Sequence, residues 1–231
     1  MSGANESGSG ARAPGLVIFD CDGVLVDSEG ISIRVLTRAI AREGGTLTEA
    51  EVHERCLGVA MADIERTASA HLGRPLPEDF AARFVADQAV EFERELQPVP
   101  GAREAIDGVR AAGWETCIAS GGRIRKMELT LRIAGLRDTF PDERIFSAYA
   151  AAVARPKPAP DLFLHAAAAC GFAPDACVVV EDSVPGVTAG RAAGMRTFGY
   201  ANGDAAHAAR LAALGAETLA ALRDLPRLLA S

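Results

Sequence analysis

A short apolar segment near the start of the chain, Leu16 to Phe19, ends abruptly in the polar sequence Asp20-Cys21-Asp22-Gly23. Four apolar residues followed at once by carboxylates are typical of a strand buried on both faces of a parallel sheet. Similar runs recur at 116–119, 177–180 and 197–200, each after a stretch with helical spacing. The alternation predicts an α/β fold on a parallel sheet, because helical crossovers join parallel strands.

The segment between Asp27 and Pro98 interrupts this alternation. Its apolar residues recur at helical spacing, which predicts four helices and no strand, at 31–43, 49–57, 60–72 and 79–96. Thr48-x-x-Glu51 is a capping box at the start of the second helix. An insertion of roughly 70 residues can form a small core of its own. We therefore predict a flexible tail, a parallel-sheet core and a hinged helical cap, with boundaries at 1–13 for the tail, 14–28 and 98–231 for the core, and 29–97 for the cap.

The composition limits the possible partners and the compartment. The chain has 24 basic and 31 acidic residues and a formal net charge of −7, so we expect no nucleic-acid partner. It has no apolar run near the roughly 18 residues of a membrane span and no signal-peptide core at its start, which predicts a cytoplasmic protein without a membrane partner. The five cysteines and four histidines have no zinc or triad spacing. We expect free cysteines and histidines at the surface or in helix packing; the oligomeric state is not indicated.

Acidic and hydroxyl side chains follow the predicted strands, at the edge where open parallel sheets bind ligands. Asp20 and Asp22 follow the first strand, Ser120 follows the second, and Glu181-Asp182 follow the run at 177–180. A single aspartate in such a place is most simply a turn or capping residue. Several close carboxylates, however, repel one another unless they share a cation. Their oxygen ligands favour Mg²⁺, which makes it the expected cofactor.

The sequence Asp20-Cys21-Asp22 allows two chemical roles. A carboxylate beside Mg²⁺ can act as a nucleophile, and a second carboxylate two residues on can transfer a proton. We assign the first role to Asp20 and the second to Asp22. Ser120 and Gly121 offer a hydroxyl and unhindered backbone N–H groups, which can bind a phosphate group of the substrate.

The chain contains only two lysines, Lys126 and Lys157, among its 24 basic residues. Lys157 lies in the proline-rich sequence Arg155-Pro156-Lys157-Pro158. A compact ammonium held there suits a point charge beside a carboxylate and a phosphoryl group, so we assign Lys157 to the catalytic site. For Lys126 the sequence favours an ordinary solvated lysine.

Taken in order, these segments resemble the four motifs of the haloacid dehalogenase superfamily of phosphohydrolases. The matching segments are 20–29, Ser120, Lys157, and 181–183 with Gly186. The resemblance implies a Rossmann-like core with a helical cap inserted after the first motif, and hydrolysis of a phosphate ester through an aspartyl-phosphate. It also implies that Mg²⁺ is held by Asp20, Asp182 and the main-chain carbonyl of Asp22, with Glu181 nearby.

Within this superfamily, the segments 140–147, 157–160 and 182–183 are most similar to sugar-phosphate phosphatases, in particular the 6-phosphogluconate phosphatases. Beta-phosphoglucomutases are similar as well, but they usually carry a cap histidine where this chain has Ser32, and the segment 57–61 lacks their Lys and Arg. The resemblance therefore implies hydrolysis of small sugar or sugar-acid phosphates. A phosphosugar mutase is the first alternative, and a receiver-like signalling module, phosphorylated on an aspartate, is a second.

Arg34 in the first cap helix is a candidate substrate ligand, and a solvent-facing charge is an equally good interpretation of it.

Overall fold

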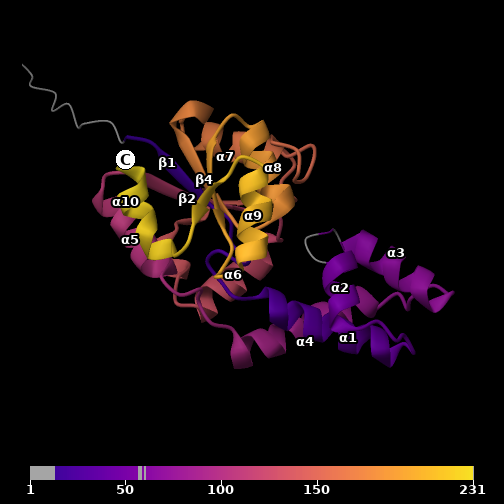
Figure 1. The fold of residues 1–231 in the computed structure, drawn as a ribbon. Coiled ribbons are helices and arrows are strands. Elements are labelled where there is room, and N and C mark those ends of the chain that lie inside the picture. The colour runs from indigo at the N-terminus through magenta and orange to yellow at the C-terminus, as the bar shows by residue number, and fades with distance from the viewer. Residues whose placement is uncertain (1–13, 57–58, 60, 231) are drawn as a thin grey trace, which may run out of the picture.

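The computed structural model describes residues 14–56, 59 and 61–230, and its centre is a six-stranded parallel sheet (Figure 1). In spatial order the strands are β3 (Ile145–Ser147), β2 (Glu115–Ser120), β1 (Leu16–Phe19), β4 (Cys177–Glu181), β5 (Arg196–Tyr200) and β6 (Glu217–Leu219). Neighbouring strands pair in parallel across the whole sheet. The predicted α/β fold class is confirmed.

Strand β1 occupies the middle of the sheet because its residues are apolar on both faces. Val17 and Phe19 belong to a core shared with α5 (Ala102–Ala111) and α6 (Ile124–Ile133). Leu16 and Ile18 belong to the opposite core, shared with α7 (Asp161–Ala169) and α8 (Val184–Ala192). Helix α9 (Ala205–Ala213) packs beside α8, and α10 (Leu225–Leu229) packs on α5. The sheet is thus covered on both faces, which explains the continuous apolar run of β1.

The strand order also determines where a ligand can bind. The chain passes from β1 to β2 and β3 on one side of the sheet, and then returns to β4 on the other side of β1. In open parallel sheets, ligands bind beyond the carboxyl ends of the strands where the order reverses. Phe19 is in register with Ile118 of β2 and with Val180 of β4. The residues that follow these strands therefore meet at one edge.

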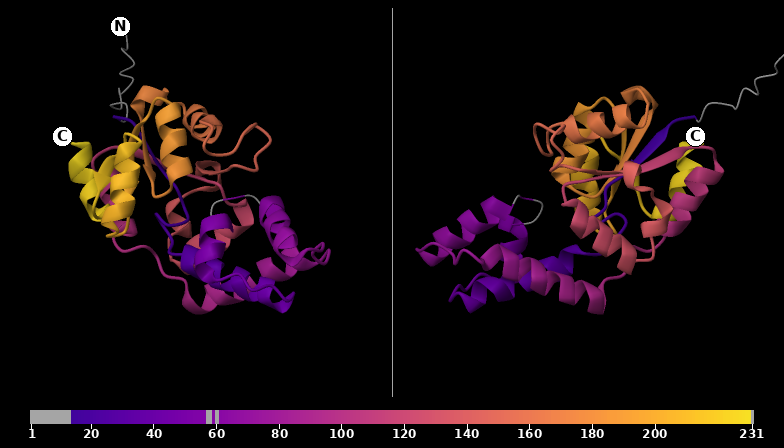
Figure 2. Two further views of the ribbon diagram at one scale, coloured as in Figure 1. Left: turned by 45° about the vertical axis from the view of Figure 1, so that its right-hand side comes forward. Right: turned by 180° about the vertical axis from the view of Figure 1, so that it is seen from behind.

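Four helices follow β1 before the sheet resumes: α1 (Glu29–Arg42), α2 (Glu49–Cys56), α3 (Met61–Leu72) and α4 (Phe80–Glu95). In Figure 1 and in both views of Figure 2 they lie together, outside the layers that cover the sheet. The predicted helices agree with them to within two residues at each end, and no strand occurs among the described residues of this segment. The two chain connections lie side by side, since Asp27 N donates to Gln97 O over 3.0 Å. Whether these helices move as a cap remains a prediction.

The capping box at the start of α2 is confirmed. Thr48 N donates to Glu51 Oε2 over 2.9 Å, and Glu51 N donates to Thr48 Oγ1 over 3.3 Å.

All five cysteines are free. None of the helices in the described part of the chain is long and apolar enough to cross a membrane. The expected tail at 1–13 lies outside the described residues, as do Leu57, Gly58 and Ala60 of the segment 57–61.

Candidate active site

Asp20 and Asp22 lie on a tight turn that leaves the end of β1. Asp20 N donates to Val180 O over 3.0 Å, which extends the sheet by one residue and buries the Asp20 carboxylate. The chain then turns at Gly23, whose φ is +80°. A Cβ atom at Gly23 would lie 1.9 Å from Asp182 Oδ2, so both the left-handed backbone and the close approach of Asp182 require glycine here.

Lys157 connects the two central strands at this edge. Its Nζ lies 2.5 Å from Asp20 Oδ1, 2.6 Å from Glu181 Oε1 and 3.2 Å from Ala119 O. Burial lowers the pKa of Lys157, but the two carboxylates outweigh burial and raise it above its ordinary value. Lys157 is therefore a permanently charged ammonium between Asp20 and Glu181, as the sequence predicted for a point charge beside a carboxylate.

The Asp20 carboxylate has an unusual pKa. Burial raises it to about 7, Lys157 partly opposes this shift, and the charges of Glu181 and Asp22 add to it. A carboxylate in such a place needs further positive charge to stay ionised.

Glu181 and Asp182 differ sharply although they are neighbours. Glu181 Oε2 accepts hydrogen bonds from Asp182 N, Ser183 N and Ser183 Oγ, over 3.1, 3.0 and 2.9 Å, while Oε1 faces Lys157. Both oxygens of Glu181 thus have partners: one contacts Lys157, and the other accepts from the β4–α8 turn. The Asp182 carboxylate, by contrast, receives no hydrogen bond or ion pair from a described residue. Burial and the charges of Glu181, Glu29 and Asp20 raise its pKa well above the usual range.

The residues present fit a magnesium ion that is completed by other oxygens. The charge of the Asp20 carboxylate contributes to the raised pKa of Asp182, and a shared cation would relieve this repulsion. Across residues 14–56, 59 and 61–230, no group of three or more His, Cys, Asp and Glu side chains is arranged to hold a metal. Mg²⁺ commonly binds one or two carboxylates and takes its remaining ligands from carbonyls, water and substrate phosphate. The donor set therefore matches Mg²⁺ and does not match a site built only from side chains.

Asp22 is paired with the second lysine of the chain. Its Oδ1 accepts from Lys126 Nζ over 2.8 Å and also from Ser28 Oγ. Burial raises the pKa of Asp22, but the charge and hydrogen bond of Lys126 outweigh it, and the net pKa is lowered. The expectation that Lys126 is an ordinary solvated lysine was wrong. Helix α6 starts soon after Ser120, so its third residue faces the first turn after β1; the scarcity of lysine in this chain was the available signal.

The loop after β2 lies beside Asp22. Ser120 is buried at the end of β2, and its Oγ accepts from Gly122 N over 3.2 Å. A Cβ atom at Gly122 would lie 3.5 Å from Asp22 Oδ2 and 3.6 Å from Ser120 Oγ. Gly121 is exposed, and a Cβ there would meet nothing within 4 Å. Gly122 thus lies between the Ser120 hydroxyl and the Asp22 carboxylate, and the backbone at Gly121 is open to solvent.

The side chain of Arg34 is paired with a carboxylate of a neighbouring helix. Its guanidinium forms an ion pair with Glu95 over 2.5 Å, and both side chains are nearly half exposed. The pair joins α1 to α4 at the surface, so the solvent-facing interpretation of Arg34 is the better one. Ser32, at the position of the mutase histidine, donates to Ser28 O over 2.8 Å and accepts from Gln88 Nε2 over 2.8 Å.

His207 reaches the site from α9, which the sequence did not indicate. Its Nε2 lies 2.5 Å from the main-chain oxygen of Asp182. Helix α9 begins after Asp204, whose side chain accepts from the backbone N–H groups of Ala206 and His207. His207 was expected at the surface or in helix packing, because the histidines of the chain have no metal or triad spacing.

Comparison with known proteins shows which proteins this chain is similar to. The chain is 36% identical to 6-phosphogluconate phosphatase of Escherichia coli (strain K12) over 183 residues, which cover 79% of this chain and 80% of that protein. It is 32% identical to hexitol phosphatase B of the same strain over 187 residues, covering 78% and 81%. A crystal structure of a HAD family hydrolase from Deinococcus radiodurans R1, with bound phosphate and sodium, matches with a TM-score of 0.75 at 33% identity, covering 95% of this chain and 96% of that one.

A family model described as haloacid dehalogenase-like hydrolase matches residues 14–194. The matched range includes β1 to β4 and every segment that carries a site residue predicted from the sequence. The chain therefore belongs to the haloacid dehalogenase-like hydrolases.

Proposed function

We propose that this protein is a Mg²⁺-dependent phosphatase of small phosphorylated sugars or sugar acids. The observation that carries the proposal is the buried Asp20 carboxylate at the end of β1, in contact with Lys157 and two residues before Asp22. The similarity to two proteins named for phosphatase activity on such compounds supports the substrate class.

Asp20 is the proposed nucleophile. Its carboxylate oxygen attacks phosphorus, the bond from phosphorus to the ester oxygen breaks, and an aspartyl-phosphate forms. Asp22 acts in its protonated form: it gives a proton to the leaving oxygen, and the charge of Lys126, which lowers the pKa of Asp22, favours this release. Water then attacks the aspartyl-phosphate and passes a proton to Asp22, which releases inorganic phosphate and restores Asp20.

The remaining residues bind and neutralise the phosphoryl group. Lys157 and Ser120, with the backbone of Gly121, would contact the phosphoryl oxygens. Asp20, Asp182 and the main-chain carbonyl of Asp22 would hold Mg²⁺, which supplies positive charge to the carboxylates and the phosphoryl oxygens. Glu181 keeps Lys157 in place. Phosphoryl transfer depends mainly on such positioning and charge stabilisation.

The helices α1 to α4 are proposed to act as a cap that closes over a small ligand and excludes bulk water. Figure 1 supports this, because they lie at the side of the sheet toward which β1 runs. A closed cap favours compact sugar phosphates over phosphoproteins. Hydrolysis is favoured over mutase activity because Ser32 is hydrogen-bonded within the helices and the mutase histidine is missing.

The test measures phosphate release with Mg²⁺ from 6-phosphogluconate, a hexitol phosphate, beta-glucose 1-phosphate and a phosphopeptide. We expect release from the small esters, and a loss of at least about a thousandfold in kcat for Asp20→Asn. Asp87→Asn, which changes a surface ion pair with Arg42, is the matched control and should behave as wild type. A phosphopeptide as best substrate, or isomerisation of beta-glucose 1-phosphate without phosphate release, would overturn the proposal.

A further inference from the structure

We propose that Lys126 is the positioning residue for Asp22: it holds one carboxylate oxygen and thereby directs the other toward the phosphate-binding loop. The inference rests on the proposed function, because it assigns Asp22 to proton transfer. It concerns a residue outside the motif segments identified in the sequence.

The two oxygens of Asp22 have different surroundings. Oδ1 accepts from both Lys126 Nζ, over 2.8 Å, and Ser28 Oγ. Oδ2 receives no hydrogen bond from any residue in the described ranges, and it is the atom nearest to a Cβ position at Gly122, at 3.5 Å. The two donors thus occupy Oδ1, and they leave free Oδ2, the oxygen that is near Gly122 of the loop.

A lysine suits this task better than an arginine. A guanidinium tends to bind both oxygens of a carboxylate at once, whereas an ammonium makes a point contact with one. The chain uses lysine at only two of its 24 basic positions. Both lysines pair with the aspartates of Asp20-Cys21-Asp22. An arginine in place of Lys126 would compete for the free oxygen that the proposed proton transfer needs.

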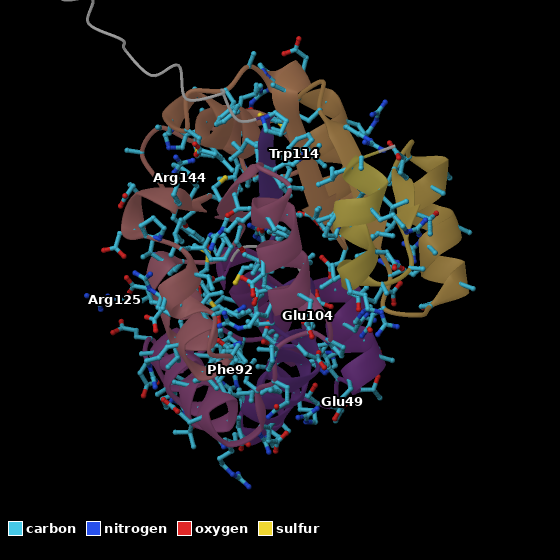
Figure 3. The ribbon with its side chains drawn as sticks, turned by 90° about the vertical axis from the view of Figure 1, so that its left-hand side faces the viewer. Glu49, Phe92, Glu104, Trp114, Arg125 and Arg144 are labelled. Atoms are coloured by element: carbon cyan, nitrogen blue, oxygen red, sulfur yellow. The ribbon has the colours of Figure 1, made fainter. Side chains whose placement is uncertain are left out.

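Two elements fix the position of the Lys126 side chain: its own helix, α6, and Phe92 on α4. Its stem belongs to α6, and its ammonium lies 5.9 Å from the centre of the Phe92 ring on α4. Figure 3 labels Phe92, where the inserted helices meet α6. Arg125, its neighbour in sequence, is exposed and points outward in the same figure. Lys126 is therefore turned inward to Asp22 by the helix itself, and its side chain is only partly exposed.

The experiment compares two phosphate esters that differ in their need for an acid. The leaving group of p-nitrophenyl phosphate is stable as an anion, whereas that of 6-phosphogluconate is an alkoxide that must be protonated. For Lys126→Met we expect kcat on 6-phosphogluconate to fall at least about tenfold more than kcat on p-nitrophenyl phosphate, with little change in KM. In an Asp22→Asn background the same substitution should cause no further selective loss, because its target is gone.

Two more variants separate positioning from folding. Arg132→Gln removes an ion pair between α6 and Glu93 of α4 and should leave both activities unchanged. Lys126→Arg keeps the charge, so a merely structural ion pair would survive in it. Under our proposal it still loses activity selectively on 6-phosphogluconate. Should Lys126→Met fail to fold, as judged by circular dichroism, Lys126→Arg carries the same comparison.

The outcomes are distinguishable. Equal losses on both esters, additive losses with Asp22→Asn, or a fully active Lys126→Arg would overturn the inference while leaving the phosphatase proposal intact. A wild-type enzyme that releases phosphate from neither ester would instead overturn the proposed function, and the role of Lys126 with it.

Discussion

Lys157 Nζ lies 2.5 Å from Asp20 Oδ1, and this contact joins the loop before α7 to the end of β1. The same ammonium also contacts Glu181 at the end of β4. Lys157 thus sets the distance between the buried carboxylates of two neighbouring strands. Removing it would leave Asp20 and Glu181 as uncompensated charges in the interior, which is costly.

Lys157→Met should impair both activity and stability. Methionine preserves much of the side-chain volume but carries no charge, so we expect kcat to fall at least about a hundredfold and the free energy of unfolding to fall by about 3 kcal/mol. Steady-state phosphate release and urea denaturation measure the two effects. Arg155→Met, two residues away in an exposed pair with Asp161, should change neither. Activity within tenfold of wild type would contradict the assignment of Lys157.

Mg²⁺ should stabilise the protein as well as activate it. The Asp182 carboxylate lies among other acidic groups that raise its pKa, and a bound cation would relieve this repulsion. We expect Mg²⁺ to raise the melting temperature, and Asp182→Ala to abolish this increase and the activity together. The exposed Asp142→Ala should keep both responses. Full activity in excess chelator after dialysis would show that the metal assignment is wrong.

Gly186→Ala should disturb the site from a distance. A Cβ at this position would lie 1.9 Å from Glu181 Oε1, so Glu181 must move and release Lys157. We expect a loss of about 1–3 kcal/mol in the free energy of unfolding, accompanied by lower kcat. Gly30→Ala in α1 is the control, since its Cβ would meet only Arg34, at 3.6 Å, and alanine favours the helix. Equal stability of the two variants would contradict the close approach at Gly186.

Much of the fold could be predicted from local patterns. The apolar runs of β1, β2, β4 and β5 lie inside the sheet and so have continuous apolar sequences. The short strands β3 and β6 lie at the sheet edges, with only three residues each, and were not predicted. Such segments are recognisable only through their pairing partners, here Ile118 with Ile145 and Phe198 with Glu217.

The site residues also fall into two groups: those at strand ends could be predicted from the sequence, and those on helices could not. Asp20, Asp22, Ser120 and Asp182 lie at or just beyond the carboxyl ends of strands, so the topology alone brings them to one edge. Lys126 and His207 enter from helices, and their approach depends on helix direction and on packing over long sequence separations. Arg34 shows the opposite case. Its nearness to the first motif in sequence suggested substrate binding, but its contact is with Glu95, which lies on α4.

Cys170 should be the reactive cysteine of this protein, with a characteristic pH dependence. It lies at the end of α7, half-buried. A hydrogen bond with Cys117 lowers the pKa of its thiol to about 7, burial opposes this shift, and Arg144 adds to it. Burial raises the pKa of Cys21, Cys117 and Cys177, the last to about 11.

The thiolate is the nucleophile, so a lower pKa means more of the reactive form at neutral pH. Alkylation by iodoacetamide, followed by peptide mass spectrometry, should label Cys170 before the other cysteines. Its rate should rise with pH and level off above about 7, well below the plateau of an ordinary thiol near 8.5. Arg144→Gln should move this plateau to higher pH, because it removes a nearby positive charge, whereas the exposed Arg66→Gln should not. A rate that still climbs from pH 8 to 9 in the wild type, or uniform labelling of the cysteines, would contradict the lowered pKa of Cys170.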